Sequence, residues 1–316
     1  MAEELSRNGD KCEIIYGSAK KKYIHALLRL PFNDIFFIQK KTTRKDIVIN
    51  KIAKFMGKKT VFDLDDAPGG VALDSEAEQT IAEIMKTSSA VTVGSHELRD
   101  FARQYNKEVY LIPTSINLDY YKLDNNKKTD TPIVLGWAGN GIVHKKELLA
   151  LLPTLKKIGK RHEIKLMIIG ALGQKEIYEN FSNVEEIEVE IIDWVSWDDP
   201  TAIPSLISQF DIGLYPLNDN EYNKYKCGLK GLEYMALKIP LVGSPVSETK
   251  HIVEDGKEGF LVSTDKEWEE KICCLIEDRE LSKRMGEAGR KKVEDTYSSK
   301  VCANELRKVF EKIKRT

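Results

Sequence analysis

The sequence predicts an α/β protein with two domains, each built on a parallel β-sheet, followed by a helical tail. Short apolar runs bounded by Gly, Pro or Asp alternate with stretches of helical periodicity over most of the 316 residues. Continuous apolar runs are typical of strands buried on both faces of a parallel sheet, and their alternation with helices indicates βαβ units. The length suits two ordinary domains.

In chain order, the expected elements fall into two groups that are separated by a segment without periodicity. The expected strands are residues 12–17, 34–39, 60–64, 90–94 and 109–113, then 133–139, 164–170, 188–193, 211–217, 239–244 and 259–263. Helical periodicity is clearest over residues 74–88, 145–162 and 229–237, and from 267 to the end.

The separating segment is residues 116–132, which are polar and aperiodic and end on Pro132. Such composition is typical of a domain boundary. We expect a first domain over residues 1–128, a second over 129–297, and a final helix over 298–316.

Charge is distributed unevenly along the chain. The net charge is −1, which gives no general attraction to nucleic acid, but residues 1–66 carry 14 lysines and arginines against 9 acids, a net of +5. Solvated helix faces explain this asymmetry, and the alternative is a basic N-terminal face that meets an anionic membrane or acceptor. No nucleic-acid partner is expected.

The cysteines and the hydropathy pattern indicate a cytoplasmic protein. The five cysteines form no Cys-x-x-Cys pair, so we expect reduced thiols, no disulfide framework and no zinc site. No apolar run suits a signal peptide or a membrane span, which leaves peripheral contact with the inner face of the membrane as the only membrane association expected.

Three acids follow one predicted strand in Thr60–Gly70, `TVFDLDDAPGG`. Asp63 and Asp65 have the spacing of nucleophile and acid/base in a haloacid-dehalogenase-type phosphatase, although Ala67 departs from that signature. A metal-dependent transferase also uses Asp-x-Asp, but the fold pattern does not suit it. As a third interpretation, Asp65 or Asp66 binds a substrate hydroxyl at the carboxyl end of a strand, or caps the turn that follows.

The stretch Asn223–Glu248 carries an anion-site pattern. Lys224, Lys226 and Lys230 lie at the start of the helix predicted over 229–237, where cations oppose the positive end of the helix dipole. An anion docked on the free N–H groups would explain them, and Gly228 would let the backbone approach closely. Glu233, three residues after Lys230, is placed to bind ribose hydroxyls. The alternative is a solvated Lys–Glu pair.

A second Gly-rich turn follows the first strand of the second domain. The amides of Gly139, Asn140 and Gly141 are expected to face a diphosphate, with Lys145 or Lys146 adding positive charge.

These segments resemble the donor-binding half of the GT-B glycosyltransferases, in particular the retaining enzymes of glycosyltransferase family 4. The resemblance rests on `GLKGLEYMALKIPLVGS`, `VEDGKEGFLV`, `GWAG`, `DIGLYPL` and `SKRMGEAGRKKVEDTYS`, and covers most of residues 60–316. It implies two Rossmann-like domains facing across a cleft, a nucleotide-sugar donor in the second, an acceptor in the first, no metal and no cofactor. It also implies a final helix that crosses back to the first domain.

The resemblance carries roles to particular residues. Glu233 matches the second Glu of the Glu-x7-Glu motif, and Lys230 the positive residue at the diphosphate. The first Glu falls at Tyr225, a departure that affects the donor-sugar contact. Asn140 stands where the family often has Arg, and Lys146 matches the family's lysine. The implied catalytic residues are Lys230, Glu233, Asp65 and Asp66. The implied donor site is Gly139, Asn140, Gly141, Lys146, Tyr225, Lys226, Cys227, Gly228, Leu229, Lys230 and Glu233.

The N-terminus also departs from the family. The first residues read as the last turn of a helix, a Gly turn and then a strand, so the first domain is expected to be short of its first strand. The implied function is metal-independent hexosyl transfer, with retention, to a polysaccharide, glycolipid or cell-surface glycan. The alternatives are a nucleotide-sugar binding protein without turnover, and the phosphatase using Asp63 and Asp65.

Overall fold

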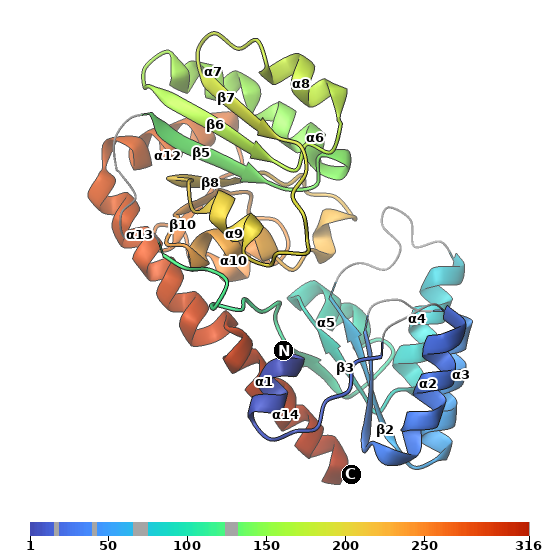
Figure 1. Cartoon of the computed structure of the whole chain (residues 1–316). Coiled ribbons are helices and arrows are strands. Elements are labelled where there is room, and N and C mark those ends of the chain that lie inside the picture. Colours follow the sequence, from blue (N-terminus) through green and yellow to red (C-terminus); the bar gives the residue numbers. More distant parts are fainter. Residues whose placement is uncertain (16–18, 40–42, 66–74, 124–131, 316) are drawn as a thin grey trace. The chain divides into compact units, whose positions relative to one another are not determined.

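The structure is a computed structural model that describes residues 1–15, 19–39, 43–65, 75–123 and 132–315. The chain forms two units (Figure 1). The first unit is Met1–Ser115, Asn220–Cys227 and Ser299–Thr316, and the second is Ile116–Asp219 and Gly228–Ser298. The α/β class, with two parallel sheets and a C-terminal helix, is confirmed. The expected boundary between residues 128 and 129 falls outside the described residues.

The first unit is built on four parallel strands in the order β1-β2-β3-β4. Its strands are β1 (Ile35–Gln39), β2 (Lys59–Leu64), β3 (Ala90–Val93) and β4 (Val109–Leu111). Its helices are α1 (Ala2–Arg7), α2 (Ala19–Arg29), η1 (Leu30–Phe32), α3 (Arg44–Phe55), α4 (Ser75–Thr87), α5 (His96–Ala102), η2 (Asn223–Tyr225) and α14 (Ser299–Arg315).

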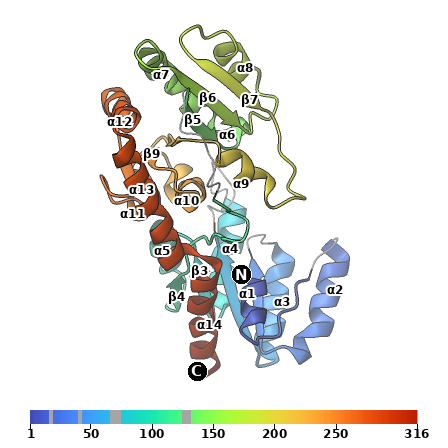
Figure 2. The same ribbon diagram turned by 60° about the vertical axis from the view of Figure 1, so that its left-hand side comes forward.

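Both faces of this sheet are covered, which explains its continuous apolar runs. Side chains alternate along a strand, so Phe62 and Leu64 pack toward α4 and α5, whereas Val61 packs toward α14. Helix α2 lies against α3 through a small apolar cluster, and both views show the two helices side by side (Figure 2).

The strand expected over residues 12–17 is not formed in its described part. Residues 11–15 have no regular structure, and Ile14 is exposed. Glu13 is held instead by α2, because its Oε1 accepts from Arg29 Nε at 2.8 Å and lies 3.1 Å from His25 Nε2. The expected helix and Gly turn before it are present, as α1 and Gly9 with φ +91°.

The second unit is built on six parallel strands in the order β10-β9-β8-β5-β6-β7. Its strands are β5 (Ile133–Ala138), β6 (Ile164–Ile169), β7 (Glu188–Ile192), β8 (Ile212–Tyr215), β9 (Leu241–Gly243) and β10 (Gly259–Leu261). Its helices are α6 (Gly141–Ala150), α7 (Leu152–Gly159), α8 (Lys175–Phe181), α9 (Ala202–Ile207), α10 (Leu229–Ala236), α11 (Thr249–Ile252), α12 (Asp265–Glu277), α13 (Arg279–Lys292) and the π-helical turn η3 (Val293–Tyr297).

The strand order determines where a ligand is expected. The chain runs from β5 outward to β7, then returns to the other side of β5 with β8, so the order reverses between β5 and β8. Loops diverge at such a point and leave a crevice at the carboxyl ends of the strands, where doubly wound sheets bind ligands. The loops after β5 and β8 are therefore the first place to examine.

One helix of this unit differs from its prediction. Residues 145–162 were expected to be continuous, but α6 ends at Ala150 and α7 begins at Leu152. Pro153, in the first turn of α7, has no N–H to continue the hydrogen bonds of α6. None of the described helices is both long and apolar enough to cross a membrane.

Candidate functional site

Helix α10 begins at the carboxyl edge of the second sheet, and its first residue is set by a glycine. Gly228 is the N-cap, with φ +69° and ψ +18° in the left-handed region. A Cβ at this position would lie 2.2 Å from Ile252 Cδ1, so a larger residue would also have to displace the end of that side chain. The first turn of α10 contains no acidic residue, and its first N–H groups have no acceptor within the helix. This helix terminus is suited to an anion.

Lys230 and Glu233 lie one helical turn apart at this terminus. Lys230 Nζ is 2.8 Å from Glu233 Oε2, and the Glu233 side chain is only 7% exposed. Despite that distance, Oε2 accepts no hydrogen bond of good geometry. The expected placement of both side chains on one helix face is thus present, and the alternative of a solvated pair does not describe a carboxylate this deeply buried.

Tyr121 completes this group, and the sequence analysis did not identify it. Its hydroxyl donates to Glu233 Oε1 at 2.8 Å. Burial and the neighbouring carboxylate raise the pKa of Tyr121 far above its ordinary value, so the hydroxyl stays protonated and remains a donor. Arg290 fixes the backbone beneath it, because Nη1 donates to Tyr121 O at 3.1 Å and to Ala236 O at 2.6 Å.

Tyr234 attaches α10 to the point where the strand order reverses. Its buried hydroxyl accepts from Ala138 N at 3.0 Å, at the end of β5, and donates to Leu214 O at 3.4 Å in β8. The ring lies against Gly213, where a Cβ would be 2.3 Å from Tyr234 Cδ2. A glycine in β8 and a tyrosine in α10 therefore fit together and position the start of the helix.

The loop after β5 differs in detail from its prediction. Gly139 N donates to Ile169 O at 3.0 Å and Gly141 N to Gly170 O at 2.8 Å, so these two amides are bound within the fold and do not face an open site. The glycines allow close packing instead, since a Cβ on Gly141 would lie 2.3 Å from Ala171 O. Asn140 is the N-cap of α6, and its Oδ1 accepts from Ile142 N.

The two lysines of α6 differ in their contacts. Lys145 Nζ is bound to Glu176 at 3.0 Å and to Gln174 at 3.3 Å. Lys146 is exposed and forms no ion pair with any described residue, so it remains available to a ligand.

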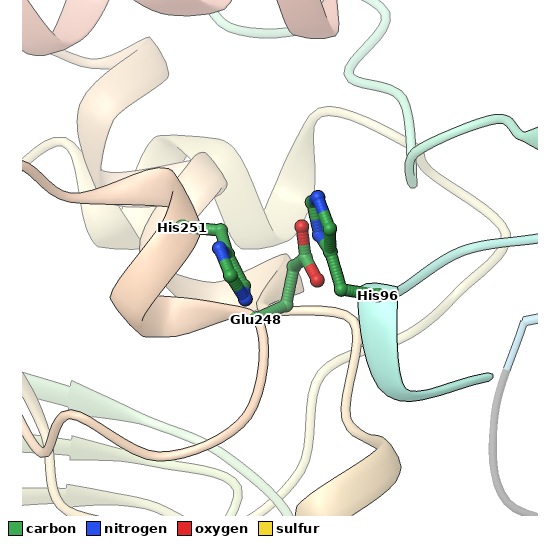
Figure 3. A group of neighbouring side chains, drawn as sticks. All are labelled: His96, Glu248 and His251. Carbon is green, nitrogen blue, oxygen red and sulfur yellow. The ribbon is translucent and has the colours of Figure 1, made fainter. Parts of the chain in front are cut away.

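The loop after β9 brings further polar groups to the same edge. Ser244 Oγ accepts from Leu217 N at 3.0 Å, which ties this loop to the one after β8. Glu248 is buried, and its Cβ lies 3.7 Å from where a Cβ of Gly228 would stand. Figure 3 shows Glu248 with His251 of α11, whose ligating atoms lie within 4.8 Å of each other. His96, the third labelled residue, begins α5 of the first unit.

The remaining predicted donor residues, 225–227, belong to the first unit. The Tyr225 ring packs on Phe101 with centroids 6.0 Å apart, and Lys226 Nζ donates to Tyr222 at 2.9 Å. Cys227 is buried, and its Sγ donates to Asp65 O at 2.7 Å. Tyr225, at the position of the family's first Glu, is thus a packing residue of the first core.

Of the three acids near β2, Asp63 and Asp65 are described and Asp66 lies outside the described residues. Asp63 is inside β2, where Thr92 Oγ1 of the neighbouring strand donates to its Oδ1 at 2.6 Å. Asp65 follows the strand. Asp63 is the penultimate residue of β2 and is half-buried, and one of its carboxylate oxygens is occupied by Thr92.

The chain has the GT-B fold, as the resemblance implied. Residues 132–278 match the family described as "Glycosyl transferases group 1". The capsular polysaccharide biosynthesis glycosyltransferase CapM of Staphylococcus aureus is 28% identical over 208 residues, 62% of this chain and 52% of CapM. The chain thus spans about half the length of that curated relative.

Solved structures share the fold over nearly the whole chain. A glycosyltransferase from Rickettsia africae has a TM-score of 0.71 at 15% identity, covering 98% of this chain and 87% of its own. HepE from Anabaena, solved in complex with UDP-glucose, has a TM-score of 0.70 at 14% identity, covering 98% and 88%.

Proposed function

We propose that the chain is a glycosyltransferase that moves a sugar from a nucleotide-sugar donor to a glycan or glycolipid acceptor in polysaccharide synthesis. The group 1 match covers most of the second unit, and the curated relative CapM is named for capsular polysaccharide biosynthesis. HepE, of the same fold, binds UDP-glucose, which favours a UDP-sugar among the donors.

The observation that carries the proposal is the start of α10. One anion is accommodated by free N–H groups, by the helix dipole and by Lys230, while the buried Glu233 carboxylate stands one turn further on. Glu233 Oε2, which accepts no hydrogen bond of good geometry, is suited to accept one from a ribose hydroxyl. A nucleoside diphosphate supplies both partners in one molecule.

The mechanism proposed is electrostatic. Lys230 and the N–H groups at Leu229 stabilise the charge that develops on the leaving diphosphate, where fixed donors act without reorganisation. With retention, the leaving phosphate itself takes the acceptor proton, so no protein nucleophile is required. The same donors replace a metal ion at the diphosphate, so the reaction is proposed to need no metal and no cofactor.

The test is calorimetric titration of the whole chain with UDP, GDP, ADP and their common sugar conjugates in the presence of a chelator. Lys230→Ala and Glu233→Ala are each compared with the protein as it stands. The matched controls are Lys257→Ala and Glu254→Ala. These two residues form an exposed ion pair with the same 2.8 Å distance and the same separation of three residues.

Binding of one nucleotide, weakened at least about tenfold by both site variants and by neither control, would support the donor site. If no nucleotide binds, or if the site variants bind normally, the proposal is wrong.

A nucleotide-sugar binding protein without turnover is the second candidate, and one observation favours it. Tyr225 replaces the acid that helps to hold the donor sugar in the family, and its ring is committed to the first core. Slow release of free sugar from the bound donor would indicate a working transferase centre. Tight binding with the donor intact over hours would favour the binding protein.

A further inference from the structure

The connection between β9 and α11 in the second unit is rich in buried polar side chains. We name residues 244–249 the polar loop, and four of its side chains are both polar and buried: Ser244, Ser247, Glu248 and Thr249. Glu248 is only 2% exposed, so its carboxylate is almost fully removed from water. Burial of such groups costs free energy unless each of them is hydrogen-bonded, so the composition of this loop requires an explanation.

The fold does not satisfy every group of the polar loop. Thr249 Oγ1 is buried and forms no hydrogen bond with any described residue, although Thr249 N donates to Val246 O at 3.2 Å. Ser247 has φ +54°, in the left-handed region that a residue with a Cβ rarely adopts. Strained backbone and unsatisfied polar groups concentrate where proteins bind ligands, and a ligand would explain both features here.

The polar loop lies against the start of α10. Glu248 Cβ is 3.7 Å from where a Cβ of Gly228 would stand, and Ile252 of α11 lies against the same position. At the other end of the loop, Ser244 Oγ accepts from Leu217 N at 3.0 Å, which ties it to the carboxyl edge of the sheet. The loop is therefore next to the proposed diphosphate position, on the side of the N-cap.

The order of groups in a nucleotide-sugar indicates which part of the donor would reach this loop. The ribose is proposed to bind at Glu233, which lies about 7 Å further along α10 than Gly228 at a rise of about 1.5 Å per residue. A diphosphate joins the ribose to the donor sugar. If the diphosphate lies at the first turn of α10, the sugar extends away from Glu233 and toward the N-cap, where the polar loop lies.

The chemistry of the polar loop suits a sugar and does not suit another anion. The Glu248 carboxylate would repel phosphate, but a carboxylate accepts hydrogen bonds at about four positions, and sugar hydroxyls are donors. Figure 3 shows His251 beside this carboxylate, with ligating atoms within 4.8 Å of each other. A carboxylate with one such neighbour can still accept from a hydroxyl, and the Thr249 hydroxyl can both donate and accept.

We propose that the polar loop binds the donor sugar, and that Glu248 and Thr249 form hydrogen bonds with its hydroxyls. This inference deepens the proposed function, on which it rests, because it assigns the sugar-binding residues of the same donor site. It requires these two side chains to contribute to the affinity for a nucleotide-sugar and not to the affinity for the nucleotide alone.

The test compares each nucleotide with its own sugar conjugate by calorimetric titration. The pairs are UDP with UDP-glucose, UDP with UDP-N-acetylglucosamine, and GDP with GDP-mannose. The ratio of the two dissociation constants, nucleotide over conjugate, measures the contribution of the sugar. For the conjugate that the parent protein binds best, we expect Glu248→Gln to lower this ratio about tenfold and to change the affinity for the nucleotide less than about twofold.

Glu258→Gln is the matched control. Glu258 is also 2% exposed and belongs to the same unit, but it accepts from Glu254 N at 2.8 Å and pairs with Lys292 of α13 at 3.4 Å. The ratio is expected to stay within about twofold of the parent value in this variant.

Thr249→Val separates a binding role from a structural one. It removes a hydroxyl that has no partner among the described residues, so we expect the urea midpoint of the ligand-free protein to stay unchanged or to rise. The ratio should nevertheless fall about threefold or more, because a hydrogen bond to the sugar is lost. The control is Thr154→Val, at a threonine of α7 that is equally buried at 1% exposure.

A ratio that Glu248→Gln or Thr249→Val leaves unchanged overturns the inference, and so does equal weakening of nucleotide and conjugate. If Glu248→Gln does not fold, Thr249→Val decides alone. An unchanged ratio with nucleotide binding intact rejects the sugar site and not the proposed function. A conjugate that binds with the expected ratios but stays intact over hours rejects turnover and supports the sugar site, whereas absence of all nucleotide binding rejects both.

Discussion

At Gly228 both the backbone conformation and the surrounding space favour glycine. The φ of +69° is unfavourable for any side chain with a Cβ, and that Cβ would meet Ile252 at 2.2 Å. We expect Gly228→Ala to lower the free energy of unfolding by about 1–3 kcal/mol and to weaken nucleotide binding, because the first turn of α10 must shift. Urea denaturation and nucleotide titration measure the two effects.

The control for this variant is Gly256→Ala. Gly256 also has positive φ, +82°, but a Cβ there has no neighbour within 4 Å. It therefore reports backbone strain without the clash and away from α10. Equal losses of nucleotide affinity in both variants would contradict the role given to Gly228.

Tyr121 is a positioning residue for Glu233, and Tyr121→Phe removes only the hydroxyl that holds Oε1. We expect a loss of about 1–3 kcal/mol in the free energy of unfolding, since a buried carboxylate oxygen loses its donor. Affinity for UDP should fall about tenfold, whereas affinity for 2′,3′-dideoxy-UDP should change little, because that nucleotide lacks the hydroxyls that Glu233 would bind.

Tyr178→Phe is the matched control, because its hydroxyl donates to Asp193 at the same 2.8 Å in the same unit but on the surface. If Tyr121 had a purely structural role, Tyr121→Phe would weaken the binding of UDP and of 2′,3′-dideoxy-UDP equally. That result would reject the positioning role.

Helix α14 is held to the first sheet by a buried stripe that includes Cys302. Burial raises the pKa of its thiol from 9.0 to about 12. Above pH 9 the unfolded chain releases this proton and the folded chain keeps it, so stability falls as pH rises from 9 toward 12. We expect Cys302→Ala to reduce the slope of the free energy of unfolding against pH by up to about 1 kcal/mol per pH unit. Urea denaturation at pH 8 to 10 measures this slope.

Cys12→Ala, which removes an exposed thiol, should leave the slope of stability against pH unchanged. An identical slope in Cys302→Ala and the parent protein would show that Cys302 is not the titrating group.

The helices and strands show which features of the fold the sequence could predict. Buried strands such as 133–139 were identified because both sheet faces are covered and the apolar run is continuous. Residues 12–17 were also expected to form a strand, but Glu13 pairs with Arg29 and no strand forms over the described residues. Periodicity reports the burial that a segment favours, and it does not report which partner the segment will find.

The residues of the candidate site likewise include some that the sequence could place and others that it could not. Lys230 and Glu233 could be placed together because three residues of helix set their spacing. Tyr121, 112 residues from Glu233, and Tyr234, which reaches both β5 and β8, could not, since their contacts exist only after the sheet has formed. Gly139 and Gly141 were expected to turn their amides toward a diphosphate, but sequence does not show that Ile169 O and Gly170 O, at the end of β6, accept from those amides.

At the scale of the whole molecule, each unit has its own apolar core. The clusters around β5 and α10 contain only residues of the second unit, and those around β2 and α14 only residues of the first. The proposed nucleotide contacts at Lys230 and Glu233 belong to the second unit. A ligand that binds one native unit stabilises that unit against opening.

We therefore expect a nucleotide to protect the two units unequally in hydrogen exchange. At about 100 times its dissociation constant, it should stabilise the second unit by about 2.7 kcal/mol, which slows exchange limited by opening of that unit about a hundredfold. Peptides from β5, β8 and α10 should show this slowing, and peptides from β2 and β3 should not. Glu233→Ala, which is expected to weaken nucleotide binding at least about tenfold, should reduce this slowing to about tenfold or less at the same nucleotide concentration. Equal slowing in both sets would mean that the two cores open as one cooperative unit, and protection of β2 and β3 alone would move the donor site to the first unit.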